Sequence, residues 1–256
     1  MSKAKTVMVV GLGETGMPLF ELISKHYAVV GLDISRPPVE VGQVDILHIC
    51  YPFVDEGFVH ETARYVGLCR PALTIVNSTV PVGTTRTISQ QTGNDVVHSP
   101  VRGKHMRMRD DLFHYTKFVG AVDRAKAERA AEHWKSIGMN TRILASPEAS
   151  ELAKLTETSY FGLLIAWAQE IERACDKSGQ DYDEVISFYE EIMFLPRVKY
   201  FPGVIGGHCV MANIDLLKQS QDSDLLDAIR SSNVRKIARE AEKERIVRSS
   251  GHSRVA

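Results

Sequence analysis

The chain has 256 residues, of which 44% are hydrophobic and 25% charged, which is typical of a soluble globular protein and argues against a disordered or collagen-like chain. The formal net charge of −1 offers no basic field for nucleic acid. No apolar run reaches the roughly 18–20 residues that a membrane helix needs. The four cysteines are widely spaced without a CxxC pair, so we expect no disulfide framework, no metal site and a cytoplasmic location.

The N-terminal part of the sequence has the order of a nucleotide-binding unit. Residues 6–11 form an apolar run that indicates a first strand rather than a signal peptide. The turn that follows is Gly11-Leu12-Gly13-Glu14-Thr15-Gly16. An apolar pattern at helical spacing comes next, and a second strand ends at Asp33. Strand, glycine turn, helix, strand and acid form the first βαβ unit of a dinucleotide-binding fold.

The residues of this turn have separate physical roles. Gly11 permits the tight turn, Gly13 lets the backbone approach a pyrophosphate, and Gly16 lets helix and strand pack closely. We expect the Asp33 carboxylate to accept hydrogen bonds from ribose hydroxyls and to repel a 2′-phosphate, which favours NAD over NADP. The alternative is a glycine turn in another α/β domain, with Asp33 as a solvated strand end.

The remaining elements predict a sheet followed by helices. Pro37 and Pro38 exclude a helix after Asp33, so we expect the chain to cross directly to a neighbouring strand and the Rossmann unit to be shortened there. Further strands are predicted at residues 44–52, 73–79, 95–100, 117–122 and 142–146, and an amphipathic helix at 127–138. Helices are predicted at 148–178, 181–192 and 223–247, with a glycine-rich loop at 195–209 and a frayed tail.

We therefore expect an α/β protein with two domains. Residues 1–146 would form a Rossmann-type parallel sheet that binds NAD. Residues 147–256 would form an all-helical domain with a long helix and a loop that carries a cysteine. Gly179 is expected to cap the long helix, and Asp181 the helix after it.

Four motifs in order carry a resemblance to a known family. They are Ser78-Thr79-Val80-Pro81-Val82-Gly83-Thr84-Thr85, His98-Ser99-Pro100, Ser146-Pro147-Glu148-Ala149-Ser150-Glu151-Leu152-Ala153-Lys154-Leu155 and Phe201-Pro202-Gly203-Val204-Ile205-Gly206-Gly207-His208-Cys209. Together with the glycine turn they resemble the UDP-glucose/GDP-mannose dehydrogenase family. That family oxidises the primary alcohol of a nucleotide sugar to a carboxylate, with two NAD per substrate.

The resemblance implies roles for particular residues. Cys209 would attack the intermediate aldehyde, Lys154 would stabilise the developing alkoxide, and Thr79 would lie near the nicotinamide and a water molecule. A cysteine flanked by glycines is open to substrate, and its thiolate is the competent nucleophile. The alternatives are a buried core cysteine, a surface lysine on a helix and an ordinary β-branched strand residue.

Further contacts follow from the same motifs and from charge. Besides the glycine turn and Asp33, cofactor contacts are expected from Tyr51, Pro52, Ser78 and Thr79. Substrate contacts are expected from Thr158, Gly206, Gly207 and His208, and from the cationic Arg102 and Arg197. Arg102, Lys104, Arg107 and Arg109 form a basic loop that would hold the phosphate or carboxylate of a smaller substrate, or would simply be solvated.

The sequence also departs from the family pattern. Val101 stands where the family has a glutamate, Thr158 where it has an asparagine, and Asn213 where it has an aspartate that helps activate water. We place Asn213 among the catalytic residues by its position, although asparagine cannot act as a general base. The family's third domain, which binds the nucleotide of the substrate, is expected to be absent.

Three hypotheses follow. The first is an NAD-dependent dehydrogenase of this family that oxidises a sugar or sugar-like alcohol through Cys209 and Lys154. The second is a two-electron dehydrogenase of the β-hydroxyacid type that uses Lys154 without a cysteine. The third is a non-catalytic NAD-binding or partner-binding module. The resemblance also implies a homodimer formed through the long helix after Pro147.

Overall fold

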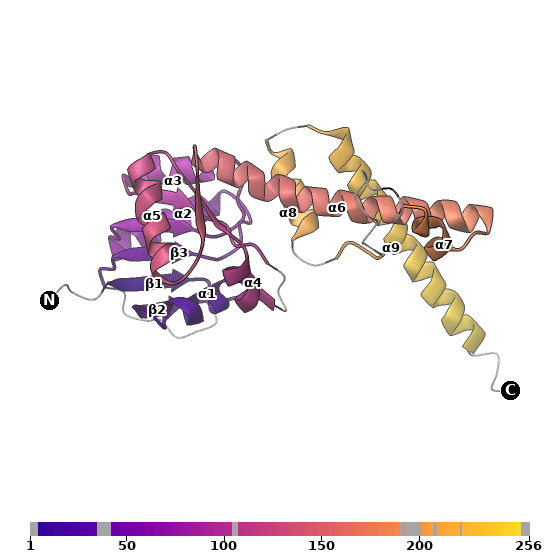
Figure 1. Cartoon of the computed structure of the whole chain (residues 1–256), viewed down its shortest axis with the longest axis horizontal. Helices are drawn as coiled ribbons and strands as arrows, with labels where there is room; N and C mark the ends of the chain where they lie inside the picture. Colours follow the sequence, from indigo (N-terminus) through magenta and orange to yellow (C-terminus); the bar gives the residue numbers. More distant parts are fainter. Residues whose placement is uncertain are drawn as a thin grey trace. The chain divides into compact units, whose positions relative to one another are not determined.

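The computed structural model describes residues 5–34, 42–103, 107–189, 192, 201–206, 209–220 and 222–251 (Figure 1). The chain divides into two compact units, Met1–Leu155 and Thr156–Ala256. The predictions for Pro37, Pro38, Lys104, Arg197, Gly207 and His208 fall outside the described residues. None of the described helices combines the length and the apolar character that crossing a bilayer demands.

The first unit contains a seven-stranded sheet with the order β2-β1-β3-β4-β5-β6-β7. Its strands are β1 (Thr6–Val10), β2 (Ala28–Leu32), β3 (Ile46–Ile49), β4 (Leu73–Val76), β5 (Val96–His98), β6 (Lys117–Ala121) and β7 (Thr141–Leu144). Every predicted strand is present, and each is somewhat shorter than predicted. β2 is an edge strand, whereas in the usual dinucleotide-binding order a further strand lies beyond it. The expected shortening after the second strand is therefore confirmed.

The sheet is mostly rather than wholly parallel. β1 to β5 run parallel, β6 is antiparallel to β5, and β7 is parallel to β6. In the described part of the connection from β5 to β6, the one helix is α4 (Met108–His114), which spans about 10 Å. The chain thus starts β6 at the edge where β5 ends, and this reverses the direction of the last two strands.

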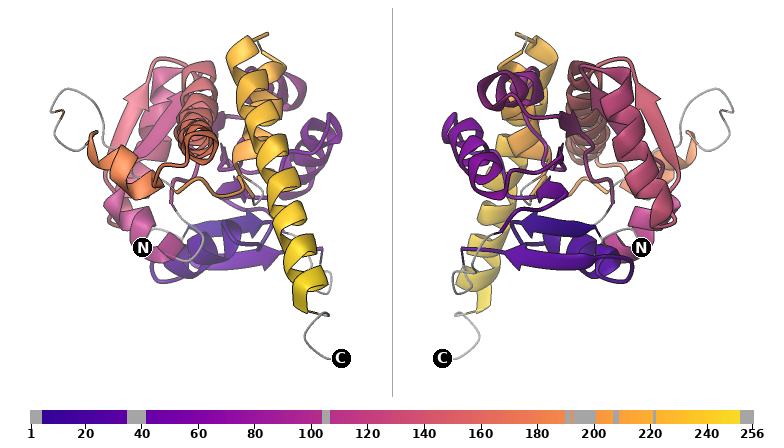
Figure 2. Two further views of the ribbon diagram at one scale, coloured as in Figure 1. Left: turned by 90° about the vertical axis from the view of Figure 1, so that its right-hand side faces the viewer. Right: turned by 90° about the vertical axis from the view of Figure 1, so that its left-hand side faces the viewer.

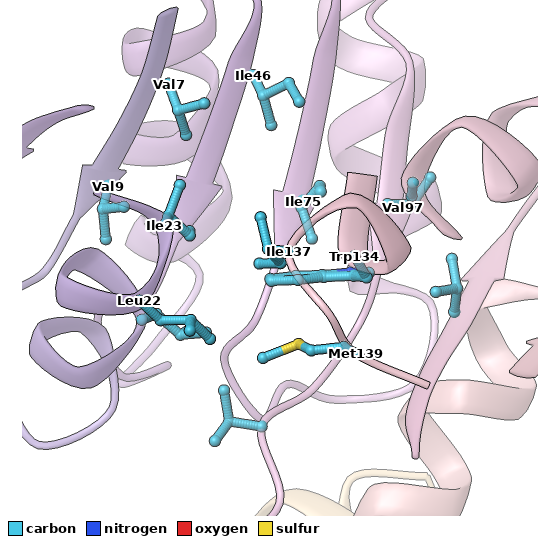
Figure 3. Close-up of a cluster of buried hydrophobic side chains, with 14 of the residues drawn as sticks. Val7, Val9, Leu22, Ile23, Ile46, Ile75, Val97, Trp134, Ile137 and Met139 are labelled. Carbon is cyan, nitrogen blue, oxygen red and sulfur yellow. The ribbon is translucent and has the colours of Figure 1, made fainter. Parts of the chain in front are cut away.

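Helices cover both faces of the sheet. On one face, α1 (Gly16–Ile23), α4 and α5 (Arg124–Ser136) pack on a core that Figure 3 shows in close-up around Trp134. On the other face, α2 (Gly57–Cys69) and α3 (Thr84–Thr92) pack on a second core. β1 contributes Val7 and Val9 to the first core and Met8 and Val10 to the second. Because helices cover both faces of the sheet, side chains on both sides of the strands face apolar surroundings. The strand sequences are therefore continuous apolar runs rather than alternating ones.

The second unit is helical, as expected. It comprises most of α6 (Pro147–Ser178), together with α7 (Tyr182–Ser187), α8 (Val210–Lys218) and α9 (Asp224–Gly251), which is yellow in Figure 2. Gly179 ends α6 with a φ of 72°, and the Asp181 carboxylate accepts from Glu184 N at 2.9 Å, so both predicted caps are confirmed. α7 is shorter than predicted. α9 continues past the predicted end at residue 247 and so includes part of the segment expected to fray.

Close packing joins α6, α8 and α9 in this unit. A Cβ on Gly162 of α6 would lie 2.6 Å from a methyl group of Val210, so glycine is what lets α8 approach α6. Ile214 and Ile229, which are both buried, lie against the same position. Along α9, Lys236 is buried and its ammonium bonds the Glu172 carboxylate at 2.7 Å.

Candidate functional site

The glycine turn between β1 and α1 needs glycine for two different reasons. Gly11 has a φ of 88°, and a Cβ there would lie 2.6 Å from the backbone nitrogen of Tyr51. A Cβ on Gly16 would lie 1.7 Å from the carbonyl oxygen of Gly11. At Gly13 a Cβ would meet no described atom within 4 Å. The first two glycines are therefore required by the fold, whereas the third leaves open space beside the backbone.

Asp33 supports this turn directly. Its Oδ2 atom accepts a hydrogen bond from the backbone nitrogen of Leu12 at 2.6 Å. The carboxylate at the end of β2 thus fixes the turn after β1, a role that we did not predict. Glu14 is exposed and Thr15 half-buried, and the Thr15 side chain makes no capping hydrogen bond to α1. Met17 N donates to the Gly13 carbonyl at 2.9 Å, and the positive end of the helix dipole at this start is suited to phosphate oxygens.

The residues after β3 and β4 meet beside the turn. The Ser78 hydroxyl donates to the carbonyl of Tyr51 at 2.6 Å and so links the two strand ends. The Tyr51 hydroxyl bonds Thr62 of α2 at 2.6 Å, and burial raises the pKa of Tyr51. Pro52 is exposed and Thr79 is half-buried. The structure therefore brings Gly11, Tyr51 and Ser78 together, as expected for one cofactor site.

His98 connects the sheet to α6. Its Nε2 lies 3.1 Å from the Ser78 carbonyl, which can only accept, so this nitrogen carries the proton. Its Nδ1, 2.9 Å from the Ser150 hydroxyl, is then the acceptor. The pKa of His98 is lowered to about 3, mainly by burial and in smaller part by the positive charges of Lys117 and Lys154, while the hydrogen bond to Ser78 opposes the shift. His98 is therefore a neutral structural link and not an acid or base at neutral pH.

Glu151 fixes the start of α6 against the start of α3. Its carboxylate accepts from Gly83 N at 2.6 Å and from Thr85 N at 2.8 Å. Burial raises the pKa of Glu151 to about 7, although the two amide donors act in the opposite direction. Arg86 of α3 adds an ion pair with Glu148 of α6 at 2.5 Å.

These contacts place Lys154 within the first unit. Lys154 is half-buried one turn after Ser150 and Glu151, and its charge lowers the pKa of both His98 and Lys117. Sequence reasoning found Lys154 but missed the side chains that position its helix. The one signal for them was the motif that contains Ser150 and Glu151 three to four residues before the lysine.

Cys209 differs from the other three cysteines, all four of which are described. It is exposed at the position that precedes the first residue of α8. A helix start favours negative charge and so favours the thiolate. Burial raises the pKa of Cys50 to about 12 and that of Cys69 to about 11, and Cys175 is buried in α6. The arrangement suits Cys209 to act as a nucleophile and the others to fill space.

The loop before Cys209 is held by two amide side chains. Asn233 of α9 accepts from Ile205 N at 2.7 Å and donates to Ile205 O at 3.0 Å. Gln169 of α6 donates to the carbonyl of Gly203 at 2.7 Å. Ser232 in turn donates to the Gln169 oxygen at 2.9 Å. Sequence reasoning missed these residues, because nothing in their surroundings relates them to a loop more than twenty residues away.

The remaining predicted residues of this unit lie on its helices or loop. Asn213 is buried on α8, and its backbone nitrogen donates to the Cys209 carbonyl at 3.0 Å. Thr158 is buried on α6. Gly206 is exposed, and a Cβ there would meet no described atom within 4 Å.

The basic loop of the first unit is mostly engaged elsewhere. Arg107 pairs with Asp111 at 3.3 Å, and Arg109 pairs with Glu21. The Arg102 guanidinium lies over the rings of Tyr115 and Phe118, 5.2 and 5.5 Å from their centroids. These contacts favour a solvated loop over a cluster of arginines directed at an anion. Val101, where the family has a glutamate, is buried in the first core.

Nothing in the described part of the chain gathers three or more histidine, cysteine or acidic side chains that could hold a metal ion.

Comparison with known proteins agrees with this arrangement. Residues 148–239 match the family model described as the UDP-glucose/GDP-mannose dehydrogenase family, central domain. The chain is 26% identical to a UDP-N-acetyl-D-mannosamine dehydrogenase of Methanococcus vannielii, over 81% of this chain and 60% of that protein. It is 25% identical to an NDP-N-acetyl-D-galactosaminuronic acid dehydrogenase of Ralstonia nicotianae, over 80% of this chain and 62% of that protein. The chain thus spans less than two thirds of the length of these relatives.

Solved structures show the same fold. The structure of UDP-D-ManNAc dehydrogenase from Pyrococcus horikoshii superposes with a TM-score of 0.80 at 22% identity, covering 93% of this chain and 70% of that one. A 3-hydroxyisobutyrate dehydrogenase from Mycobacterium tuberculosis superposes with a TM-score of 0.74 at 16% identity, covering 92% of this chain and 94% of that one.

Proposed function

We propose that the chain, whose residues 148–239 match the central domain of the UDP-glucose/GDP-mannose dehydrogenase family, is an NAD-dependent dehydrogenase that oxidises the primary alcohol of a nucleotide sugar or a related sugar. The observation that carries the proposal is Cys209, exposed at the start of α8 after a loop anchored by Asn233. A two-electron dehydrogenase needs no such cysteine, whereas oxidation beyond the aldehyde needs a nucleophile.

The first unit is proposed to bind the cofactor. The open space beside Gly13 and the start of α1, which Thr15 does not cap, fit a pyrophosphate, and Asp33 at the end of β2 fits an adenosine ribose. Asp33 accepts from the backbone of Leu12 through Oδ2 and so also holds the turn. When bound, NAD supplies the acceptor for the hydride in each oxidation. Tyr51, Pro52, Ser78 and Thr79 are proposed to line the nicotinamide side.

The protein's own groups act on the substrate in a fixed order. Lys154 stabilises the alkoxide as the alcohol loses its proton and a hydride, which gives an aldehyde. The Cys209 thiolate then adds to the aldehyde carbon, and the carbonyl oxygen becomes a hydroxyl of a thiohemiacetal. Loss of a second hydride and of the hydroxyl proton gives a thioester. Water adds to that carbonyl, the carbon–sulfur bond breaks, and the carboxylate leaves with the thiolate restored.

Asn213 cannot take the proton from that water, because an amide has no basic site at neutral pH. Its buried position on α8, one helical turn after Cys209, suits it to hold the start of that helix instead. We therefore expect thioester hydrolysis to be the slow step. Thr158, Gly206, Gly207, His208 and Arg197 are proposed substrate contacts, whereas the position of Arg102 over Tyr115 and Phe118 does not favour that role for it. A homodimer through α6 is proposed from the same resemblance.

The test is to count NADH formed per substrate consumed, over a panel of nucleotide sugars, sugar phosphates and hydroxy acids. Two NADH and an acid product support the proposal, because alcohol to acid removes two hydrides. Cys209→Ala should abolish acid formation, and Cys175→Ala, a buried cysteine of the same unit, should leave it unchanged. Binding of NADH without turnover on any substrate would instead support a non-catalytic NAD-binding module.

A second candidate is a two-electron dehydrogenase of the β-hydroxyacid type that uses Lys154. The neighbour from Mycobacterium tuberculosis favours it, because that hydroxyacid dehydrogenase consists almost wholly of the two units seen here. The same assay separates the candidates. One NADH per substrate, with full activity in Cys209→Ala, would establish the second and reject the first.

A further inference from the structure

Lys117 is a buried lysine that no step of the proposed reaction uses. It is the first residue of β6, and only 4% of its surface is exposed. Antiparallel pairing of His98 with Gly120 places the start of β6 beside the backbone that follows β5. Its side chain therefore lies at the edge where the parallel strands end, which is the edge at which open α/β sheets bind ligands.

Three acceptors surround the ammonium group of Lys117. Nζ lies 2.7 Å from the carbonyl of Ser99, 3.0 Å from that of Pro100 and 3.3 Å from Oδ1 of Asn77. An ammonium group has three N–H donors, so each N–H of Lys117 has one of these three oxygens as its acceptor. The ring of Trp134 lies 4.6 Å from Nζ, measured to its centroid. Within the described residues, no carboxylate contributes to the environment of this lysine.

Fold stability alone does not account for a lysine at this position. Burial lowers the pKa of Lys117 to about 7; the charge of Lys154 acts in the same direction, and Cys50 opposes it. The other titratable groups that face it, His48 and His98, are kept neutral by burial, which lowers the pKa of each. An apolar residue would occupy the site without the cost of desolvating a charge.

The acceptors belong to the segments that carry the proposed cofactor contacts. Asn77 immediately precedes Ser78 and Thr79. Its backbone carbonyl accepts from Val101 N at 3.2 Å, which continues the pairing between the ends of β4 and β5. Lys117 adds a side-chain link between the same two segments.

Lys117 also contributes to the orientation of the Asn77 amide. An ammonium can only donate, so Asn77 must present its oxygen to Lys117. The amide nitrogen then donates to Nδ1 of His48 at 3.1 Å and to the carbonyl of Ile75 at 3.2 Å. His48 Nε2, which carries the proton, donates to His133 Nε2 at 3.1 Å. The Ile75 carbonyl, which can only accept, favours the same orientation, so Lys117 and Ile75 fix it together.

We infer that Lys117 is a positioning residue: its buried ammonium holds the carboxyl ends of β4 and β5 in the arrangement that presents Ser78 and Thr79 to the cofactor. The cofactor half of this inference rests on the proposed function. The claim that Lys117 holds the two strand ends does not depend on the proposed function, and it is tested on the protein without any ligand.

The variant that tests the inference is Lys117→Met, which keeps the length of the side chain and removes every donor. Lys117→Gln keeps an N–H donor without the charge, and it replaces Lys117→Met as the test variant if the methionine variant does not fold. The matched control is Lys126→Met, which removes a half-buried lysine of α5 whose partner Asp95 keeps its pair with Arg129.

The first measurement is hydrogen exchange of the full chain without ligand, resolved by peptide. In Lys117→Met, the amides of Ser99 and Val101 should exchange about tenfold faster, as expected for loss of hydrogen bonds to a charged group; Pro100 has no amide hydrogen. Peptides from β1 and β2 should exchange as in the wild type, and Lys126→Met should match the wild type throughout. Unchanged exchange at 99–101, or a uniform increase over the sheet, would overturn the inference.

The second measurement is NADH affinity by fluorescence titration. Lys117→Met should bind NADH about tenfold more weakly than the wild type and Lys126→Met. Faster exchange at 99–101 with unchanged NADH affinity would show that Lys117 has only a structural role, which overturns the inference. A wild-type protein that binds no NADH would instead refute the proposed function, and the exchange measurement would still decide whether Lys117 holds the strand ends.

Discussion

Two regions are proposed to do the chemistry: the segments at the carboxyl edge of the sheet and the loop before Cys209. Both are irregular backbone, but different contacts hold them in place. The segments at the carboxyl edge of the sheet continue from strands whose backbones are already paired, and Asp33, Ser78 and Lys117 add links between neighbouring ends. The loop before Cys209 continues from no strand, and Asn233 and Gln169 from two helices hold it instead. The first arrangement follows from strand order, and the second from side chains that meet only in the folded unit.

This difference predicts which substitutions damage the fold and which damage only a site. At the sheet edge, the backbone itself fills the space, so added atoms collide with backbone. In the cysteine loop, the backbone depends on a few side-chain amides, so removing atoms should be the more damaging change. The predictions below run from the largest expected change in stability to the smallest.

The largest effect is expected for Gly16→Ala at the start of α1. A Cβ there would lie 1.7 Å from the Gly11 carbonyl oxygen, and backbone cannot move aside as a side chain can. We expect a loss of about 3 kcal/mol or more, at the upper end of the cost of overpacking. Thermal denaturation followed by circular dichroism measures it.

Gly67→Ala is the matched control for that measurement. Gly67 is exposed in the interior of α2, and a Cβ would meet no described atom within 4 Å. Alanine should raise stability there by up to about 1 kcal/mol, because it is the better helix former. A Gly16→Ala protein as stable as the wild type would show that the turn is not held by close backbone packing.

The next largest effect is expected for Asn233→Leu, which keeps the size of the side chain and removes both hydrogen bonds to Ile205. An unpaired buried backbone group costs about 1–3 kcal/mol. Amides of residues 201–206 should exchange about tenfold faster and turnover should fall, while NADH affinity stays unchanged. Ser231→Ala, an exposed change on the same helix, is the control. An equal loss of NADH affinity in Asn233→Leu would mean that the two segments are not held independently.

The third prediction concerns Glu151 and pH. Its folded pKa of about 7 lies above the ordinary value of 4.5, so the folded chain binds this proton more tightly than the unfolded chain. Its contribution to stability therefore falls as pH rises from 4.5 to 7. Glu151→Gln should remove that slope and cost about 1–3 kcal/mol, since one amide oxygen cannot serve both Gly83 N and Thr85 N.

The measurement is the difference in unfolding free energy between Glu151→Gln and the wild type across this pH range. A difference is needed because buried histidines act in the opposite sense: burial lowers the pKa of His98 and His133 to about 3 and 4, so their contributions rise with pH below 6.5. Glu132→Gln, an exposed change on α5, should leave the slope intact. A slope that survives in Glu151→Gln would show that this carboxyl is ionised throughout.

The sequence predicted the sheet edge better than the cysteine loop, for physical reasons. Apolar runs, the glycine turn and Asp33 are local signals, and parallel pairing then brings successive strand ends to one edge. Residues such as Lys117 and Glu151 could not be predicted, because their roles depend on burial, and a lone lysine at the start of a strand reads as a surface residue. The reversal of β6 and β7 was missed because periodicity carries no information about strand direction.

The cysteine loop could be located but not explained from sequence. Its glycines and Cys209 stand out as a motif, whereas Asn233 and Gln169 lie within helices whose amphipathic pattern accommodates them as ordinary polar residues. Their partners are distant in the chain, and no local spacing predicts such pairing. In both units, the residues expected to touch a ligand were thus more visible in the sequence than the residues that position them.

The smallest change in stability is expected where a glycine faces open space. Gly13 at the sheet edge and Gly206 in the cysteine loop both lack a described neighbour within 4 Å of an added Cβ, and neither has the left-handed backbone that demands glycine. Alanine at either position should change stability by no more than about 0.5 kcal/mol. Gly13→Ala should nevertheless weaken NADH binding about tenfold or more, because the methyl group would occupy the place of the pyrophosphate. Gly206→Ala should leave NADH affinity intact and raise the KM of the sugar substrate. Since the fold needs neither glycine, a Gly13→Ala protein with normal NADH affinity would leave its open space without a function and would remove the main physical argument for a cofactor at this turn.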